Sequence, residues 1–195
     1  MPTDEMIVAQ TREWVLSVVI GDNFCPFARK EMENDTIRYC VIRDTGHEGT
    51  GAWDENAFEY AMMALLAECR LLDEDAGVET TLLIIPEGVD DFDHYLGLLS
   101  LANELLAAQG YEGRYQLASF HPDYCFAGAS KDDPANYTNR SPYPTLHLIR
   151  EASIERVLQG VEKPERIPER NIRYAREAGL AAMQARLQAC LKPKE

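Results

Sequence analysis

The sequence predicts an α/β fold, with α+β as the alternative: one layered domain over residues 1–195, with helices flanking a mixed four-stranded sheet. Two observations carry this prediction. Strand-like segments alternate along the chain with segments of helical periodicity, and one of them, "TTLLIIP" (80–86), is the continuous apolar run typical of a strand buried on both faces. A chain of 195 residues is long enough for one well-filled core. Both ends of the chain are expected to be helical.

In the first third of the chain, the apolar residues of 4–20 recur at helical spacing, and Gly21 is the expected stop. "TIRYCVIR" (36–43) alternates as a strand does. The glycine-rich segment 45–51 lacks the Gly-Lys-Ser/Thr of a phosphate loop and is interpreted as a turn. Residues 54–73 then form an amphipathic helix.

The middle of the chain continues the alternation. The buried strand 80–86 is followed by a helix over 91–109, which Gly110 ends, and by a strand over 114–120. Strands joined through a helix are expected to be parallel neighbours.

The last third of the chain begins with a long segment, 121–144, that has no clear periodicity. Such long connections are uncommon in compact domains, and its four aromatic residues argue for an ordered, functional loop. A fourth strand, 145–150, is expected to pair antiparallel after this loop. Two helices, near 152–159 and 168–191, close the chain.

The charge, hydropathy and cysteine pattern of the chain indicate which partners and which cellular location to expect. The formal net charge of −14 argues against nucleic acid and against an anionic membrane surface as partners. No apolar run could span a bilayer, and the N-terminus does not resemble a signal peptide, so a cytoplasmic protein is expected. The five cysteines include no Cys-x-x-Cys and are expected to be free thiols. A small-molecule substrate is the expected partner.

Cys25, in "DNFCPFARK", is the first candidate catalytic residue. Pro26 suits a first helical position, which makes Cys25 a candidate N-cap of a short helix. A thiol there would face unpaired amide N–H groups and the positive end of the helix dipole, which lower its pKa. A buried structural cysteine is the alternative. A glutaredoxin-like activity fits poorly, because the lead-in to Cys25 has helical rather than strand periodicity.

"FHPDYCF" brings together a second set of candidates. A cysteine nucleophile needs a base, and the base needs an orienting group. His121 is the candidate general base for Cys25, with Asp123 or His147 as the orienting partner. The alternative for His147 is a core histidine satisfied by one hydrogen bond.

The same segment also suggests a metal. Imidazole, carboxylate and thiolate all bind zinc, so His121, Asp123, Cys125 and His147 are candidate ligands, although their spacing is not diagnostic. In "TNRSPYP", Asn139 and Arg140 are candidates for binding an anionic group of the substrate, since a guanidinium offers a planar fork of donors.

Four stretches of the chain, "NFCPFA", "ASFHPDY" with the following "FAG", "TNRSPYPTLHLIRE" and "TTLLIIP", resemble the bacterial domain-of-unknown-function family 1415. The resemblance extends over nearly the whole chain. It implies a bacterial cytosolic setting and identifies no activity and no catalytic residue.

The leading hypothesis is a small-molecule enzyme, a hydrolase or group transferase, with a Cys/His site that binds an anionic substrate. The first alternative is a metal-dependent hydrolase that uses the four candidate zinc ligands. The second is a non-catalytic binding or assembly module, whose partner surface would combine the aromatic-rich loop with the basic C-terminal helix.

Overall fold

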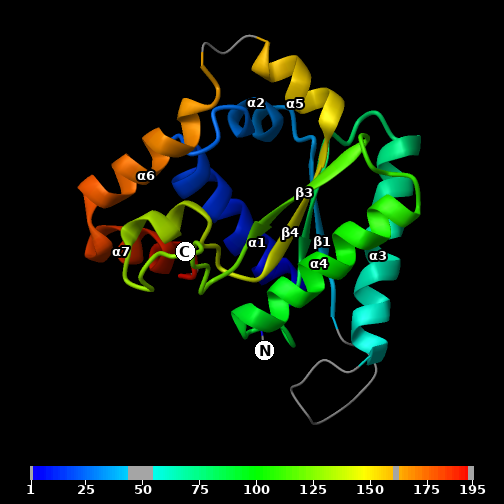
Figure 1. The fold of residues 1–195 in the computed structure, drawn as a ribbon, viewed down its shortest axis with the longest axis horizontal. Coiled ribbons are helices and arrows are strands. Elements are labelled where there is room, and N and C mark those ends of the chain that lie inside the picture. The colour runs from blue at the N-terminus through cyan, green and yellow to red at the C-terminus, as the bar shows by residue number, and fades with distance from the viewer. Residues whose placement is uncertain (1, 44–54, 160–162, 193–195) are drawn as a thin grey trace.

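The computed structural model describes residues 2–43, 55–159 and 163–192. In these ranges seven α-helices surround one four-stranded sheet, and helices lie at both ends of the chain (Figure 1). The fold class predicted from the sequence is therefore confirmed. The helices are α1 (Asp4–Trp14), α2 (Ala28–Glu33), α3 (Glu55–Glu74), α4 (Phe92–Ala108), α5 (Glu151–Leu158), α6 (Arg166–Ala178) and α7 (Leu180–Cys190). The strands are β1 (Ile37–Val41), β2 (Thr80–Ile84), β3 (Tyr115–Phe120) and β4 (Thr145–Arg150).

The sheet has the strand order β1-β2-β4-β3 and is mixed. β1 and β2 are parallel, as expected for two strands joined through a helix. β4 is antiparallel to both β2 and β3, which confirms its expected direction. The expectation that β2 and β3 would be neighbours was wrong, because β4 inserts between them and takes up the hydrogen-bonding edge of each.

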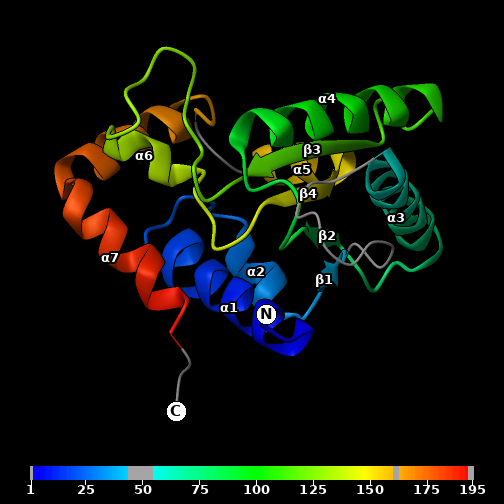
Figure 2. The same cartoon turned by 90° about the horizontal axis from the view of Figure 1, so that it is seen from below.

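The two faces of the sheet are covered by different helices. On one face, Leu83, Leu146 and Leu148 pack with residues of α3 and α4. On the other face, Leu82 and Ile84 pack with α1 and with α6 and α7. Figure 2 shows α3 and α4 on one side of the sheet and α1 and α2 on the other. All five residues of β2 are buried, as its unbroken apolar sequence predicts.

Two predicted helices differ in detail from the observed ones. The N-terminal helix is α-helical only to Trp14 and continues as a π-helix over Val15–Ile20. The predicted helix 168–191 is broken at Gly179, whose φ of 84° and ψ of 159° lie in a region that side chains disfavour. The predicted glycine-rich turn 45–51 lies outside the described residues.

The long loop between β3 and β4 folds back on itself and contains a 3-10 helix, Pro134–Thr138. Tyr137 of this helix is buried in the same core as α6 and α7. The Arg176 guanidinium of α6 contacts both carboxylate oxygens of Asp133, at 3.1 and 2.7 Å. The loop and the C-terminal helices are thus parts of one packed unit. No helix in the described ranges is both long enough and apolar enough to cross a membrane.

Candidate functional site

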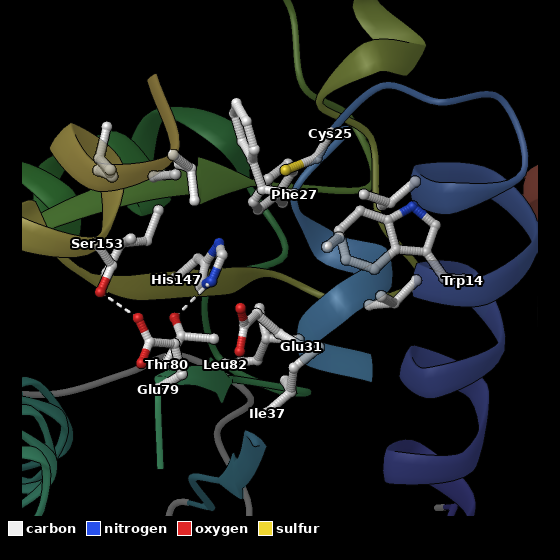
Figure 3. Close-up of a pocket in the computed structure, with 18 residues that line it drawn as sticks. Trp14, Cys25, Phe27, Glu31, Ile37, Glu79, Thr80, Leu82, His147 and Ser153 are labelled. Atoms are coloured by element: carbon white, nitrogen blue, oxygen red, sulfur yellow. Dashed lines mark hydrogen bonds between the residues drawn. The ribbon is translucent and has the colours of Figure 1, made fainter. Parts of the chain in front are cut away.

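A cavity of about 250 Å³ lies between the α1 face of the sheet and the elements that cover it. Its floor is formed by β2, β3 and β4, and its walls by the end of α1, the π-helix, the segment around Cys25, and α5 (Figure 3). Most lining side chains are apolar. The residues that line it are Trp14, Val15, Val19, Cys25, Phe27, Ala28, Glu31, Ile37, Glu79, Thr80, Leu82, Ala118, Phe120, His147, Ile149, Ser153, Ile154 and Val157.

The π-helix shapes the wall beside Trp14. Its wider turn is visible at Gly21, whose N–H donates to the carbonyl of Leu16, five residues earlier, at 3.1 Å. A Cβ on Gly21 would collide with the backbone oxygen of Ser17, so this end of the π-helix requires glycine. Single π-helical turns are frequent at functional sites, since they displace side chains relative to a regular helix. Here the π-helix directs Val15 and Val19 to the cavity.

The position of Cys25 is set by the same π-helix. Asn23 takes a left-handed φ of 57°, which turns the chain back on itself. The Cys25 N–H then donates to the Val19 carbonyl at 3.3 Å. From the other side, the Asn171 side chain of α6 donates to the carbonyl of Phe24 at 2.8 Å. The turn that carries Cys25 is therefore held by hydrogen bonds to the π-helix on one side and to α6 on the other.

The structure corrects the expectation that Cys25 caps a helix. The short helix begins at Ala28 with Phe27 as its N-cap, so Cys25 lies two residues before the cap. Burial raises the pKa of the Cys25 thiol, and the backbone N–H groups of Phe27 and Ala28 offset this only in part. The direction is opposite to the one expected from a helix N-terminus, and the thiol is protonated at neutral pH.

His147 lies in the middle of the cavity floor. On β4 it pairs with Leu82 of β2 and with Ala118 of β3, and all three side chains line the cavity. Its Nε2 lies 2.8 Å from the Thr80 hydroxyl. That hydroxyl donates to the backbone oxygen of Leu148 at 2.6 Å. In Figure 3 the other ring nitrogen of His147 points away from Thr80, toward the side of the cavity where Cys25 lies.

The cavity holds its thiol and its imidazole uncharged. Burial lowers the pKa of His147 to about 4, because the apolar walls disfavour the imidazolium. The charged lining residues are Glu31 and Glu79, on the other side of His147 from Cys25 (Figure 3), and no Lys or Arg is among the described lining residues. Glu79 accepts hydrogen bonds from Ser153 and, at 2.9 Å, from Arg156 of α5.

His121 lies outside this cavity and is fully buried. Its Nδ1 accepts from the backbone N–H of Asp123 at 3.0 Å, and its Nε2 donates to the carbonyl of Val89 at 2.9 Å. Its ring packs against Phe92 and Tyr95, in the core on the α4 side of the sheet. Burial lowers the pKa of His121. With both ring nitrogens bonded, this histidine ties the start of the long loop to the segment before α4.

The remaining candidates for metal binding are not gathered together. Asp123 is exposed, Cys125 contacts the backbone oxygens of Phe126 and Ala129, and His147 points into the cavity from the opposite side of the sheet to the core that holds the His121 ring. In residues 2–43, 55–159 and 163–192, no three His, Cys, Asp or Glu side chains are grouped so that they could hold a metal ion.

Asn139 and Arg140 also lie away from the cavity. Asn139 donates from its side chain to the Ser119 carbonyl at 3.2 Å. The Arg140 guanidinium lies 4.5 Å from the Tyr137 ring centre and donates to backbone oxygens of Tyr124 and Lys131. These contacts shape the long loop from within. Of the seven candidate site residues, the structure brings together Cys25 and His147, which line one cavity.

A family described as "Protein of unknown function (DUF1415)" matches residues 6–185. The chain belongs to this family. Searches of curated proteins and of solved structures found no significant match. The family match includes every lining residue of the cavity, so the cavity is formed by the portion of the chain that defines the family.

Sequence reasoning missed Thr80, Trp14 and the α5 residue Ser153 as parts of the site. Thr80 and Thr81 precede the apolar residues of β2, and the polar side chain of Thr80 at a buried position was the available signal. Trp14 was assigned only to the apolar face of a helix. Nothing in the local sequence of α5 indicates that it covers a cavity.

Proposed function

We propose that the protein binds a small, mainly apolar molecule in the cavity between the sheet, the π-helix and α5. The observation that carries this proposal is a cavity of about 250 Å³ with apolar walls and a half-buried, uncharged histidine in its floor. Pockets with few, defined polar groups among apolar walls are typical of small-molecule sites. We propose a neutral ligand in place of the anionic substrate expected from the sequence, because the described lining offers no cation and holds two carboxylates.

Binding is tested by filling the cavity. Ala118 lies beside His147 in the sheet register, so Ala118→Leu places new side-chain volume over the floor of the cavity. Naphthalene binding is followed by ligand-observed NMR on the wild type and the variant. We expect binding to the wild type and at least a tenfold loss in Ala118→Leu. The control is Gly97→Ala, on α4 with open space around the added methyl group. Equal binding by all three proteins would refute the proposal.

A second candidate function is thiol-dependent hydrolysis or group transfer, favoured by Cys25 and His147 lining one cavity. The Cys25 sulfur would attack an electrophilic carbon such as an acyl carbon, and the thiol proton would pass to His147. The leaving group would depart with that proton, and a thioester on Cys25 would remain. Water or an acceptor hydroxyl would then attack the thioester, give its proton to the departing sulfur through His147, and regenerate the thiol.

The resting site sets a condition on this chemistry. Both groups are neutral, because burial raises the pKa of the thiol and lowers the pKa of the imidazole. Proton transfer between them would create an ion pair in apolar surroundings, so it must accompany the attack on the substrate rather than precede it.

The enzyme hypothesis is tested by mass spectrometry after incubation with 4-nitrophenyl acetate. Acetylation of Cys25, lost in Cys25→Ala and slowed at least tenfold in His147→Phe, is the expected result. The four other cysteines, at 40, 69, 125 and 190, serve as internal controls. Labelling of Cys25 that is no slower in His147→Phe would exclude His147 as the base.

A further inference from the structure

We infer that the cavity selects a neutral, mainly apolar molecule with a hydrogen-bond donor, and that His147 Nδ1 accepts that hydrogen bond. The inference rests on the binding function proposed above and adds the class of ligand. It follows from the direction of each hydrogen bond around the histidine, from the polar groups of the lining and from the size of the cavity.

The hydrogen bonds at Thr80 determine which nitrogen of His147 carries the proton. The Leu148 carbonyl can only accept, so the single hydroxyl proton of Thr80 points to that carbonyl. Thr80 must therefore accept from His147, and the Nε2 of His147 is the protonated nitrogen. The uncharged ring then presents a bare lone pair on Nδ1. This nitrogen has no hydrogen-bond partner among the described residues, and it points into the cavity (Figure 3).

The other polar groups that face the cavity beside His147 also accept rather than donate. The indole N–H of Trp14 is buried without a hydrogen-bond partner among the described residues, and it points away from His147 (Figure 3). Ser153 donates to Glu79 and accepts from Arg156, at 3.1 Å. Glu31 accepts from the Thr36 hydroxyl at 2.7 Å and offers further carboxylate lone pairs. Apart from the weakly donating thiol of Cys25, these groups leave no donor for a ligand. A ligand carboxylate or phosphate would therefore meet lone pairs and negative charge, whereas a hydroxyl or amide N–H would meet an acceptor.

The size of the cavity limits the ligand to one or two rings, or a chain of similar volume. An apolar cavity of about 150 Å³ is known to hold benzene, so about 250 Å³ accommodates a molecule of naphthalene size. The walls around Nδ1 of His147 are aliphatic and aromatic. They include Trp14 and Phe120, whose ring centres lie 5.1 Å apart in an edge-to-face arrangement. 2-Naphthol, with one hydroxyl on an apolar body, is therefore a suitable probe.

The experiment compares five probes at pH 7 by isothermal titration calorimetry: naphthalene, 2-naphthol, 2-methoxynaphthalene, 2-naphthoate and 1-naphthylmethylamine. A net hydrogen bond contributes about 0.5–1.5 kcal/mol, which corresponds to roughly two- to twelvefold in affinity. We expect 2-naphthol to bind tighter than 2-methoxynaphthalene by this factor, and 2-naphthoate to bind most weakly. His147→Phe keeps a planar ring and should abolish the preference for 2-naphthol while naphthalene affinity changes less than twofold.

Thr80→Val tests the fixed proton position directly. Valine has the shape of threonine but cannot accept from Nε2, so the ring is free to carry its proton on Nδ1. We expect 2-naphthol and 2-methoxynaphthalene to bind this variant with nearly equal affinity. Gly97→Ala, on α4 with open space around the added methyl group and outside the cavity lining, should keep the preference.

The outcomes separate this inference from the proposal on which it rests. If no probe binds, the binding function itself fails. If naphthalene binds but 2-naphthol binds no tighter than 2-methoxynaphthalene, the inference is wrong and the binding function stands. If 1-naphthylmethylamine binds tightest, the carboxylates of Glu31 and Glu79 select the ligand rather than His147, and the inference is also wrong.

Discussion

Acidification should destabilise the protein through His147. Its pKa is about 4 in the folded state, against an ordinary value of 6.5, because burial disfavours the charged ring. Between these two values the unfolded chain binds a proton that the folded chain does not. The free energy of unfolding therefore falls as the pH is lowered from about 6.5 to about 4, and the contribution of the neutral ring is fully present above that window.

The magnitude follows from the shift. Each pKa unit corresponds to 1.36 kcal/mol, so the full shift costs about 3 kcal/mol, with a slope of at most about 1.4 kcal/mol per pH unit. His121, whose pKa is also lowered by burial, adds a loss of the same sign, so wild type alone cannot isolate His147. The comparison with His147→Phe isolates it, because His121 is present in both proteins.

The assay is urea unfolding followed by circular dichroism, at half-unit steps from pH 7 to pH 4. Wild type should lose about 3 kcal/mol more than His147→Phe over this range. Stability curves that run parallel from pH 7 to pH 4 would refute the reasoning, since they would mean that the His147 ring charges in the folded state as easily as in water.

Three further predictions concern the scaffold and the thiol. Gly179→Ala should lower the free energy of unfolding by about 1–3 kcal/mol, because the φ of 84° and ψ of 159° at this position suit only glycine. Gly97→Ala lies in a helix with room for a methyl group and should instead raise the free energy of unfolding by about 0.5–1 kcal/mol. Equal effects of the two variants in urea unfolding would contradict both expectations. Glu68→Ala should lower the free energy of unfolding by about 1–3 kcal/mol in the same assay, because it leaves the buried hydroxyl of Thr81 without its acceptor. An unchanged free energy of unfolding would show that water replaces the carboxylate as the acceptor. Cys25 should react with iodoacetamide more slowly at pH 7 than a free cysteine peptide, because burial raises its pKa, and a faster reaction by mass spectrometry would overturn that direction.

Much of the fold could be predicted from local patterns. The helix after β1, the buried run of β2 and the strand β4 all follow from side-chain periodicity, which depends on neighbours within a few residues. The strand order could not be predicted in this way. The long loop between β3 and β4 returns the chain to a position between β2 and β3, and no periodicity records where a long loop returns.

The candidate site shows the same division. The sequence indicated Cys25 and His147 as candidate catalytic residues, but it made His121 the candidate general base for Cys25. The choice was reasonable locally, because His121 lies in a loop rich in polar groups. What decides the pairing is the sheet: His147 faces the α1 side with Leu82, whereas the His121 ring packs against Tyr95 on the α4 side. That side is set by strand register, a non-local property.

The protonation state of Cys25 depends on where the short helix after it begins, and a shift of two residues changes it. Had the helix started at Pro26, the thiol would have faced free N–H groups and a favourable dipole. It starts at Ala28, and the thiol lies instead against an apolar cavity whose floor holds a neutral imidazole. Burial then outweighs the two nearby backbone donors. The resting thiol is therefore protonated, and under the proposed function any chemistry at Cys25 would begin only when a ligand enters beside it.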